Sequence, residues 1–115
     1  MIAVIFESWP KPGRGQDYID FGVKLGHLLE GRDGFISVER FRSVSEPGKF
    51  VALSFWRDEA AVDAFRTLPA HRAIQARSRA EVFDDYRLRV ATVIRDYTKD
   101  DRTQAPADTQ TPTTD

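Results

Sequence analysis

The side chain whose chemistry best suits catalysis is His71. An imidazole titrates near neutral pH, so it can take the proton of a phenol, and an electron-rich phenolate can then pass an electron to dioxygen without metal or flavin. His71 follows Pro69 at the expected start of a helix, near the mouth of a pocket between sheet and helices. The alternative is a histidine that serves packing only. The other histidine, His27, is expected to face solvent.

Charged residues inside expected strands are the next candidates. Arg87 and Arg89 alternate with apolar residues near the end of the chain, and Glu39 and Arg40 lie in an earlier strand. A charge that is covered by other elements needs a partner. In a catalytic arrangement, Arg87 or Arg89 stabilises the negative charge that develops on an oxygen. In a structural arrangement, Glu39 pairs with one of the arginines and sets the register of the strands.

Aromatic residues predict the lining of a pocket for a flat ligand. Trp56 ends a strand, Phe65 lies on the inward side of a helix, and Phe6 belongs to the opening strand. Tyr86 heads the last strand, where its hydroxyl could orient a quinone oxygen. For each of them the alternative is packing in the core or at a subunit interface.

The elements that must position these residues follow from hydrophobic periodicity and turn residues. Alternation predicts strands at residues 2–9, 35–44, 50–56 and 86–97, with a turn at Pro47 and Gly48 between the middle two. Helical spacing begins at Asp17, a second helix follows Asp58 as N-cap, and Pro69 interrupts it before a short helix at residues 70–78. The order predicts an α+β fold of the ferredoxin-like βαββαβ type, with an antiparallel sheet and helices on one face.

The second face of that sheet has no helix to cover it. The first strand and residues 50–56 nevertheless carry bulky apolar residues on both sides. Such a patch is larger than a monomer normally exposes. We therefore predict a homodimer in which two sheet faces pack together, the arrangement of a dimeric α+β barrel.

Length and composition indicate one domain at residues 1–98, followed by a polar tail at residues 99–115. The tail reads KDDRTQAPADTQTPTTD and has no apolar residue larger than alanine, so we expect it to be disordered.

Other protein classes are disfavoured by composition. A net charge of −1 gives no reason to expect a nucleic-acid partner. No apolar run is long enough to span a membrane, and no signal peptide is visible. We therefore expect a cytoplasmic location and no membrane partner. The absence of cysteine excludes disulfides and thiolate metal sites. Two distant histidines are poor evidence for a metal site, and no phosphate-binding glycine loop occurs, so we expect neither metal nor cofactor.

Three segments of the sequence resemble a known family. GFISVERF, FWRDEAAVDAFRTLPAHR and DYRLRV are similar to the antibiotic biosynthesis monooxygenase family of dimeric α+β barrels, and the likeness covers about residues 1–98. The resemblance implies the ferredoxin-like fold and a place among cofactor-independent oxygenases of phenolic or quinol-like compounds, quinol monooxygenases, haem-degrading enzymes and proteins of unknown activity.

The resemblance also allows two branches of the family to be compared residue by residue. The haem-degrading branch has an Asn near the end of the first strand, a Trp on the helix after the hairpin and a His ten residues further on. Here Glu7 and its neighbours, Phe65 and Gln75 stand in those places, so haem degradation is disfavoured. The phenol-oxidising branch lines its pocket with Asn, Trp, Tyr and Arg. This sequence has Trp56, Tyr86 and Arg87 near the corresponding elements but contains no Asn.

Together these observations predict a monooxygenase that oxidises a small aromatic substrate with dioxygen. His71 is the base, Arg87 or Arg89 stabilises the anion, Tyr86 orients an oxygen, and Trp56, Phe65 and Phe6 line the pocket, with Glu39 beside the arginines. The alternative is a non-catalytic small-molecule-binding or stress-associated protein with the same fold, which the missing Asn favours. A third possibility is a haem-binding protein.

Overall fold

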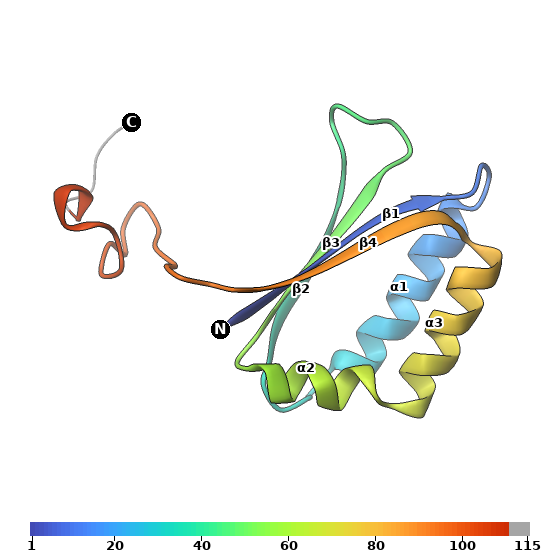
Figure 1. Cartoon of the computed structure of the whole chain (residues 1–115), viewed down its shortest axis with the longest axis horizontal. Helices are drawn as coiled ribbons and strands as arrows, with labels where there is room; N and C mark the ends of the chain where they lie inside the picture. Colours follow the sequence, from blue (N-terminus) through green and yellow to red (C-terminus); the bar gives the residue numbers. More distant parts are fainter. Residues whose placement is uncertain (111–115) are drawn as a thin grey trace.

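The computed structural model describes residues 1–110, and the predicted ferredoxin-like α+β fold is confirmed (Figure 1). The second helix of the simplest form of this fold is divided into two helices here. The first ends at Arg66, and Pro69 begins the next after a break at residues 67–68. The elements are β1 (Ile2–Pro10), α1 (Gly15–Leu29), β2 (Phe35–Arg42), β3 (Phe50–Trp56), α2 (Glu59–Arg66), α3 (Pro69–Glu81), β4 (Phe83–Thr92) and a 3₁₀ helix, η1 (Ala107–Thr109).

The four strands form one antiparallel sheet in the order β2-β3-β1-β4. The last strand lies earlier in the chain than the alternation of residues 86–97 predicts. The pairing with β1 explains why β4 begins and ends earlier than predicted, because β4 can form hydrogen bonds only along the length of β1. Phe83 lies opposite Pro10 at one end of β1 and Thr92 lies opposite Ile2 at the other, so the ladder ends there.

Local signals in the sequence account for the turns and helix starts. Gly48 adopts the left-handed conformation in the β2–β3 turn (φ 83°), which a residue with a side chain rarely adopts. The carboxylate of Asp58 accepts a hydrogen bond of 2.9 Å from the backbone N–H of Ala61, as expected for the N-cap of α2.

The three α-helices lie on one side of the sheet, and Figure 1 shows α1 and α3 running along it while α2 crosses one end. Side chains of Ile2, Trp56, Leu29, Ala61 and Phe65 form the buried core between the sheet and the helices. The core therefore lies at the α2 end of the space between the layers.

The opposite face of the sheet is covered by no element within residues 1–110. Because side chains alternate along a strand, the residues beside those of the core point to this open face. Ile5 and Leu53 lie opposite one another at its centre, and Ala3 lies opposite Phe55. The structure thus has the uncovered apolar face that the sequence predicts.

Beyond β4 the chain leaves the sheet and folds back on itself away from the helices (Figure 1). The side chain of Arg102 donates a hydrogen bond of 3.0 Å to the carbonyl of Thr109 and stacks over the ring of Tyr97 at 4.9 Å. The disorder expected for residues 99–115 stays a prediction, and residues 111–115 lie outside the described part. Within residues 1–110, no helix is long and apolar enough to cross a membrane.

Candidate active site

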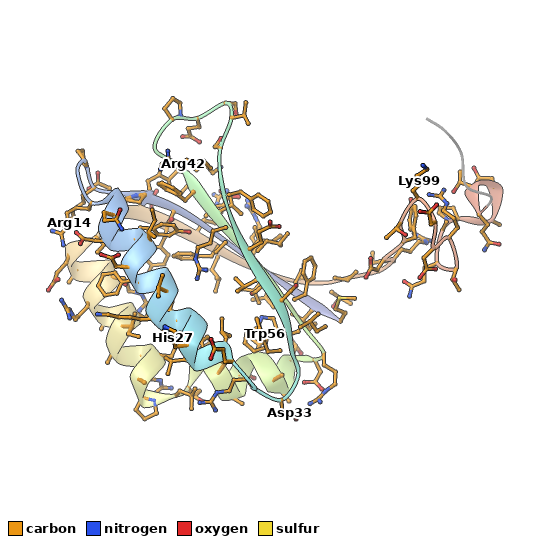
Figure 2. All side chains as sticks on the ribbon, turned by 180° about the vertical axis from the view of Figure 1, so that it is seen from behind. Arg14, His27, Asp33, Arg42, Trp56 and Lys99 are labelled. Atoms are coloured by element: carbon orange, nitrogen blue, oxygen red, sulfur yellow. The ribbon has the colours of Figure 1, made fainter. Side chains whose placement is uncertain are left out.

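A cavity of about 360 Å³ lies between the sheet and the helices, within the size range of small-molecule sites. In Figure 2, side chains from both layers meet in this space, and Trp56 lies at the end next to α2. Leu88 and Val90 of β4 line the cavity and are about half exposed (51% and 49%), so the cavity opens to solvent beside this edge strand. Most of the lining is apolar, and the polar groups gather at a few places.

His71 lies in the lining, half-buried at the first turn of α3. Its Nδ1 is 3.2 Å from the backbone carbonyl of Arg66. Because a carbonyl oxygen can only accept, Nδ1 carries the proton and Nε2 keeps its lone pair. Burial lowers the pKa of His71, and the nearby charges of Arg79 and Arg66 act in the same direction, while the hydrogen bond to the Arg66 carbonyl opposes them. The ring is therefore a neutral imidazole at pH 7, as a general base must be.

Three of the predicted aromatic residues lie in the lining together. The rings of Trp56 and Phe65 are 5.5 Å apart, and Phe65 is 4.6 Å from the imidazole of His71. Trp56 donates from Nε1 to the hydroxyl of Ser54 at 3.0 Å, which holds the indole in one orientation. Phe6 of β1 lies opposite Ala52, on the side of the sheet that faces the cavity. His71, Trp56, Phe65 and Phe6 thus face one common space.

Tyr86 lies beside the cavity, in a hollow of about 20 Å³ that shares Phe6 and Phe83 with it. Its ring packs 5.8 Å from Phe6, and the guanidinium of Arg79 lies over it at 5.5 Å. Tyr86 is not among the residues that line the cavity.

The charged residues predicted for the site do not come to the cavity. Leu88 and Val90 face it, so the residues that alternate with them along β4, Arg87 and Arg89, point to the open face of the sheet. There Arg89 contacts Glu7 at 2.8 Å, and Lys49 contacts the same carboxylate at 3.1 Å. The hydrogen bond from Lys49 is the main cause that lowers the pKa of Glu7.

Glu39 is exposed and pairs with none of these arginines within residues 1–110. The predicted ion network therefore exists on the open face with Glu7 in place of Glu39. The role of Arg87 or Arg89 as an anion stabiliser inside the cavity is not supported by this geometry, because the register of β4 turns both side chains away.

Two arginines line the cavity: one is Arg66, which pairs with Asp63, and the other is Arg40 of β2. Its side chain runs along α1 at Gly22, where a Cβ atom would come within 2.8 Å of Nε of Arg40. Glycine in the middle of a helix normally weakens it, so the missing side chain has a local use: it leaves room for the guanidinium. A glycine at the centre of an amphipathic helix was the one sign of this contact in the sequence.

Two buried hydroxyls lie near Arg40, and one of them, that of Tyr18, lines the cavity. Tyr18 is 5% exposed and Ser8 is fully buried, and neither hydroxyl has a hydrogen-bond partner within the described residues. Burial raises the pKa of Tyr18, and the charge of Arg40 acts in the opposite direction from nearby. Buried polar atoms without partners are rare and point to a missing ligand or water.

Within residues 1–110, no group of three His, Cys, Asp or Glu residues is arranged to hold a metal ion. The cavity instead offers the imidazole of His71, the guanidinium groups of Arg40 and Arg66, the hydroxyl of Tyr18 and a large aromatic surface. This set suits the binding of an organic molecule and the removal of one proton from it.

The layered fold and its internal cavity define the chain as a ferredoxin-like α+β domain with an apolar pocket. The sequence profile of the family described as antibiotic biosynthesis monooxygenase matches residues 1–77, and the chain belongs to this family.

Individual relatives agree with that assignment. The chain is 42% identical over 93 residues to the jasmonate monooxygenase ABM of Pyricularia oryzae, a match that covers 81% of this chain and 43% of that protein. The chain therefore spans less than half the length of this curated relative.

Solved structures share the fold at low sequence identity. A protein of Mycobacterium tuberculosis superposes with a TM-score of 0.75 at 18% identity, covering 84% of this chain and 98% of the other. A mutant of SnoaB, a cofactor-independent oxygenase from Streptomyces nogalater, has a TM-score of 0.71 at 14% identity, covering 80% and 91%.

Proposed function

We propose that this domain is a cofactor-independent monooxygenase that oxidises a small organic molecule in the cavity with dioxygen. The observation that carries the proposal is the place of His71 in the lining of an apolar cavity, with Nδ1 held by the Arg66 carbonyl so that Nε2 is free to accept a proton; the burial that lowers its pKa supports this role. Membership of the monooxygenase family supports the reaction class.

The substrate class that fits best is a phenol or quinol. Nε2 of His71 takes the phenolic proton, the phenolate gives one electron to dioxygen, and the superoxide and phenoxyl radical then join through a new C–O bond. The peroxide anion formed takes the proton back from His71 and becomes a hydroperoxide. Loss of water from the resulting hydroperoxide leaves a quinone. One oxygen atom ends in the product and the other in water, and the substrate supplies all the electrons. The adjacent rings of Trp56 and Phe65 offer flat surfaces for such a molecule.

A second candidate substrate is a jasmonate, and the similarity to the Pyricularia oryzae protein favours it. Hydroxylation of a saturated carbon needs two further electrons, because such a carbon does not reduce dioxygen by itself. A jasmonate would thus be oxidised only with an added electron donor, which distinguishes it from a phenol in the assay.

The open face of the sheet supports a homodimer. Ile5, Leu53 and Phe55 are apolar residues of the two central strands that no element within residues 1–110 covers. A second copy packing its own sheet there would bury them and enclose the ion pairs of Glu7. Sedimentation of the protein at micromolar concentration tests this: a monomer would contradict the dimer.

The test of the activity is oxygen consumption by the purified, metal-free protein with a panel of hydroquinones, anthrone-like phenols and jasmonate, each with and without an added reductant. We expect uptake above the autoxidation rate with a phenol alone, one ¹⁸O atom from ¹⁸O₂ in the product, and loss of the catalysed rate in His71→Ala. His27→Ala is the matched control, since His27 is exposed on α1. No catalysed uptake with any compound, in a folded protein, would favour the non-catalytic binding protein instead.

A further inference from the structure

The polar groups of the cavity are separated along the strands. Trp56 lies opposite Ile2, while Ala52 lies opposite both Phe6 and Arg40. Four residues of strand separate the two levels, which corresponds to about 13 Å at 3.3 Å per residue. His71 belongs to the Trp56 level through Phe65. The base and the guanidinium of Arg40 therefore stand near opposite ends of an apolar space.

Arg40 is available to a ligand. It makes no ion pair with any acidic side chain within residues 1–110, although it is only partly exposed. A guanidinium covered by other groups needs an anion to offset its desolvation. The contact with Gly22 keeps it alongside α1 and inside the cavity lining.

The hydroxyl of Tyr18 extends the same polar end. Tyr18 lines the cavity and its hydroxyl lacks a partner, whereas Ser8, whose hydroxyl also lacks one, is fully buried and is not part of the lining. Both lie close enough to influence each other, and Arg40 lies close to Tyr18, but no hydrogen bond is completed between them. The hydroxyl of Tyr18 and the guanidinium of Arg40 are two donors in the lining that match the two oxygens of a carboxylate.

The α2 side of the cavity has the opposite charge. Glu59, Asp63 and Arg66 line it, and Arg66 pairs with Asp63 at 3.3 Å, which leaves the charge of Glu59 as an excess of negative charge. An anion would be repelled there and attracted to Arg40. The charges thus orient a ligand that is negative at one end.

We propose that the substrate of this cavity is an amphipathic carboxylate. Arg40 binds its carboxylate with help from the hydroxyl of Tyr18, its apolar body fills the space beneath α1 and α3, and its oxidisable group lies beside His71. The inference deepens the proposed function and rests on it for the oxidation step, whereas the binding of the carboxylate is independent of turnover.

Binding can be measured by fluorescence without any reaction. The chain has two tryptophans, and Trp9 lies away from the cavity with its indole bonded to Glu46 at 3.1 Å. In a Trp9→Phe background, Trp56 reports from the cavity alone. A suitable probe is 4′-hydroxybiphenyl-4-carboxylate, whose phenol and carboxylate stand at opposite ends of two rings, compared with its methyl ester.

We expect the acid to bind about tenfold to a hundredfold more tightly than the ester, the range expected for hydrogen bonds to a charged group. Arg40→Gln should remove this preference, and Tyr18→Phe should reduce it. Arg42→Gln is the matched control, because Arg42 lies on the same strand and packs on Phe50 outside the cavity lining. Gly22→Ala gives a second route to the same loss, since it displaces the guanidinium without removing its charge.

The outcomes separate this inference from the proposed function. Preference for the acid that depends on Arg40, without oxygen consumption, would uphold the carboxylate site and contradict the monooxygenase. Oxygen consumption with equal affinity for acid and ester would do the reverse. Failure of the acid to bind, equal affinity for the two probes, or unchanged affinity in both Arg40→Gln and Gly22→Ala would overturn the carboxylate site.

Discussion

We expect Gly22→Ala to stabilise helix α1 while it moves the guanidinium of Arg40 out of the cavity. The new Cβ would stand 2.8 Å from Nε and 3.0 Å from Cζ of Arg40. These atoms belong to the far end of a flexible side chain, so the arginine can rotate aside and the helix need not shift. The substitution therefore has one favourable and one unfavourable consequence for the free energy of unfolding.

The two contributions can be compared. Alanine is more favourable than glycine in a helix interior by about 1 kcal/mol. Moving Arg40 to a less favourable rotamer costs on the order of 0.5–1.5 kcal/mol. The net change in unfolding free energy lies close to zero, and Tm should change by no more than about 4 °C, the shift that about 1 kcal/mol produces in a domain of this size.

Gly26→Ala supplies the matched comparison. Gly26 lies one turn further along α1, and a Cβ there would meet nothing within 4 Å. This variant should show the gain in helix stability without any effect on Arg40. Thermal unfolding followed by circular dichroism, together with acid and ester binding, would be measured for both variants. Loss of more than about 2 kcal/mol in Gly22→Ala, or full retention of acid binding, would refute the reasoning, because either result means that Arg40 does not yield as described.

Three further predictions concern the base, the core and the subunit contact. Because burial lowers the pKa of His71, its titration should leave kcat/KM level from pH 7 to 8 and reduce kcat/KM at acid pH, with an apparent pKa below 6.5. The unfolded chain binds this proton more readily than the folded one, so the free energy of unfolding should also decline as the pH drops from 6.5 towards the lowered pKa. A pH–rate profile with its acid limb above 6.5 would exclude His71 as the base. Leu29→Ala should lower the free energy of unfolding by about 2–3 kcal/mol. This is the lower part of the range for Leu→Ala, because Leu29 is 4% exposed but already borders the cavity. A loss below about 1 kcal/mol in urea unfolding would contradict its place in the core. Leu53→Asp, which puts a charge at the centre of the open face, should convert a dimer to a monomer in sedimentation, and an unchanged dimer would place the interface elsewhere.

Part of this molecule followed directly from local patterns in the sequence. The order of elements, the hairpin turn at Gly48, the Asp58 cap and the break at Pro69 each depend on a few neighbouring residues, and the structure confirms them. The positions of Trp56, Phe65 and His71 around one space also follow from that order, because the fold brings the end of β3 against α2 and the start of α3.

What the tertiary structure alone decided was which charges enter the cavity. β2 carries apolar residues on both sides, Val38 on one and Phe41 on the other, so its alternation does not tell whether Arg40 points to the helices or away from them. The answer depends on the pairing of β2 with β3 and on Gly22, a contact between residues far apart in the chain. Likewise, the register of β4 against β1 turned Arg87 and Arg89 to the open face and ended the strand at Thr92. Periodicity along one segment determines that a strand forms, whereas the side it presents to the cavity is determined by the segments packed against it.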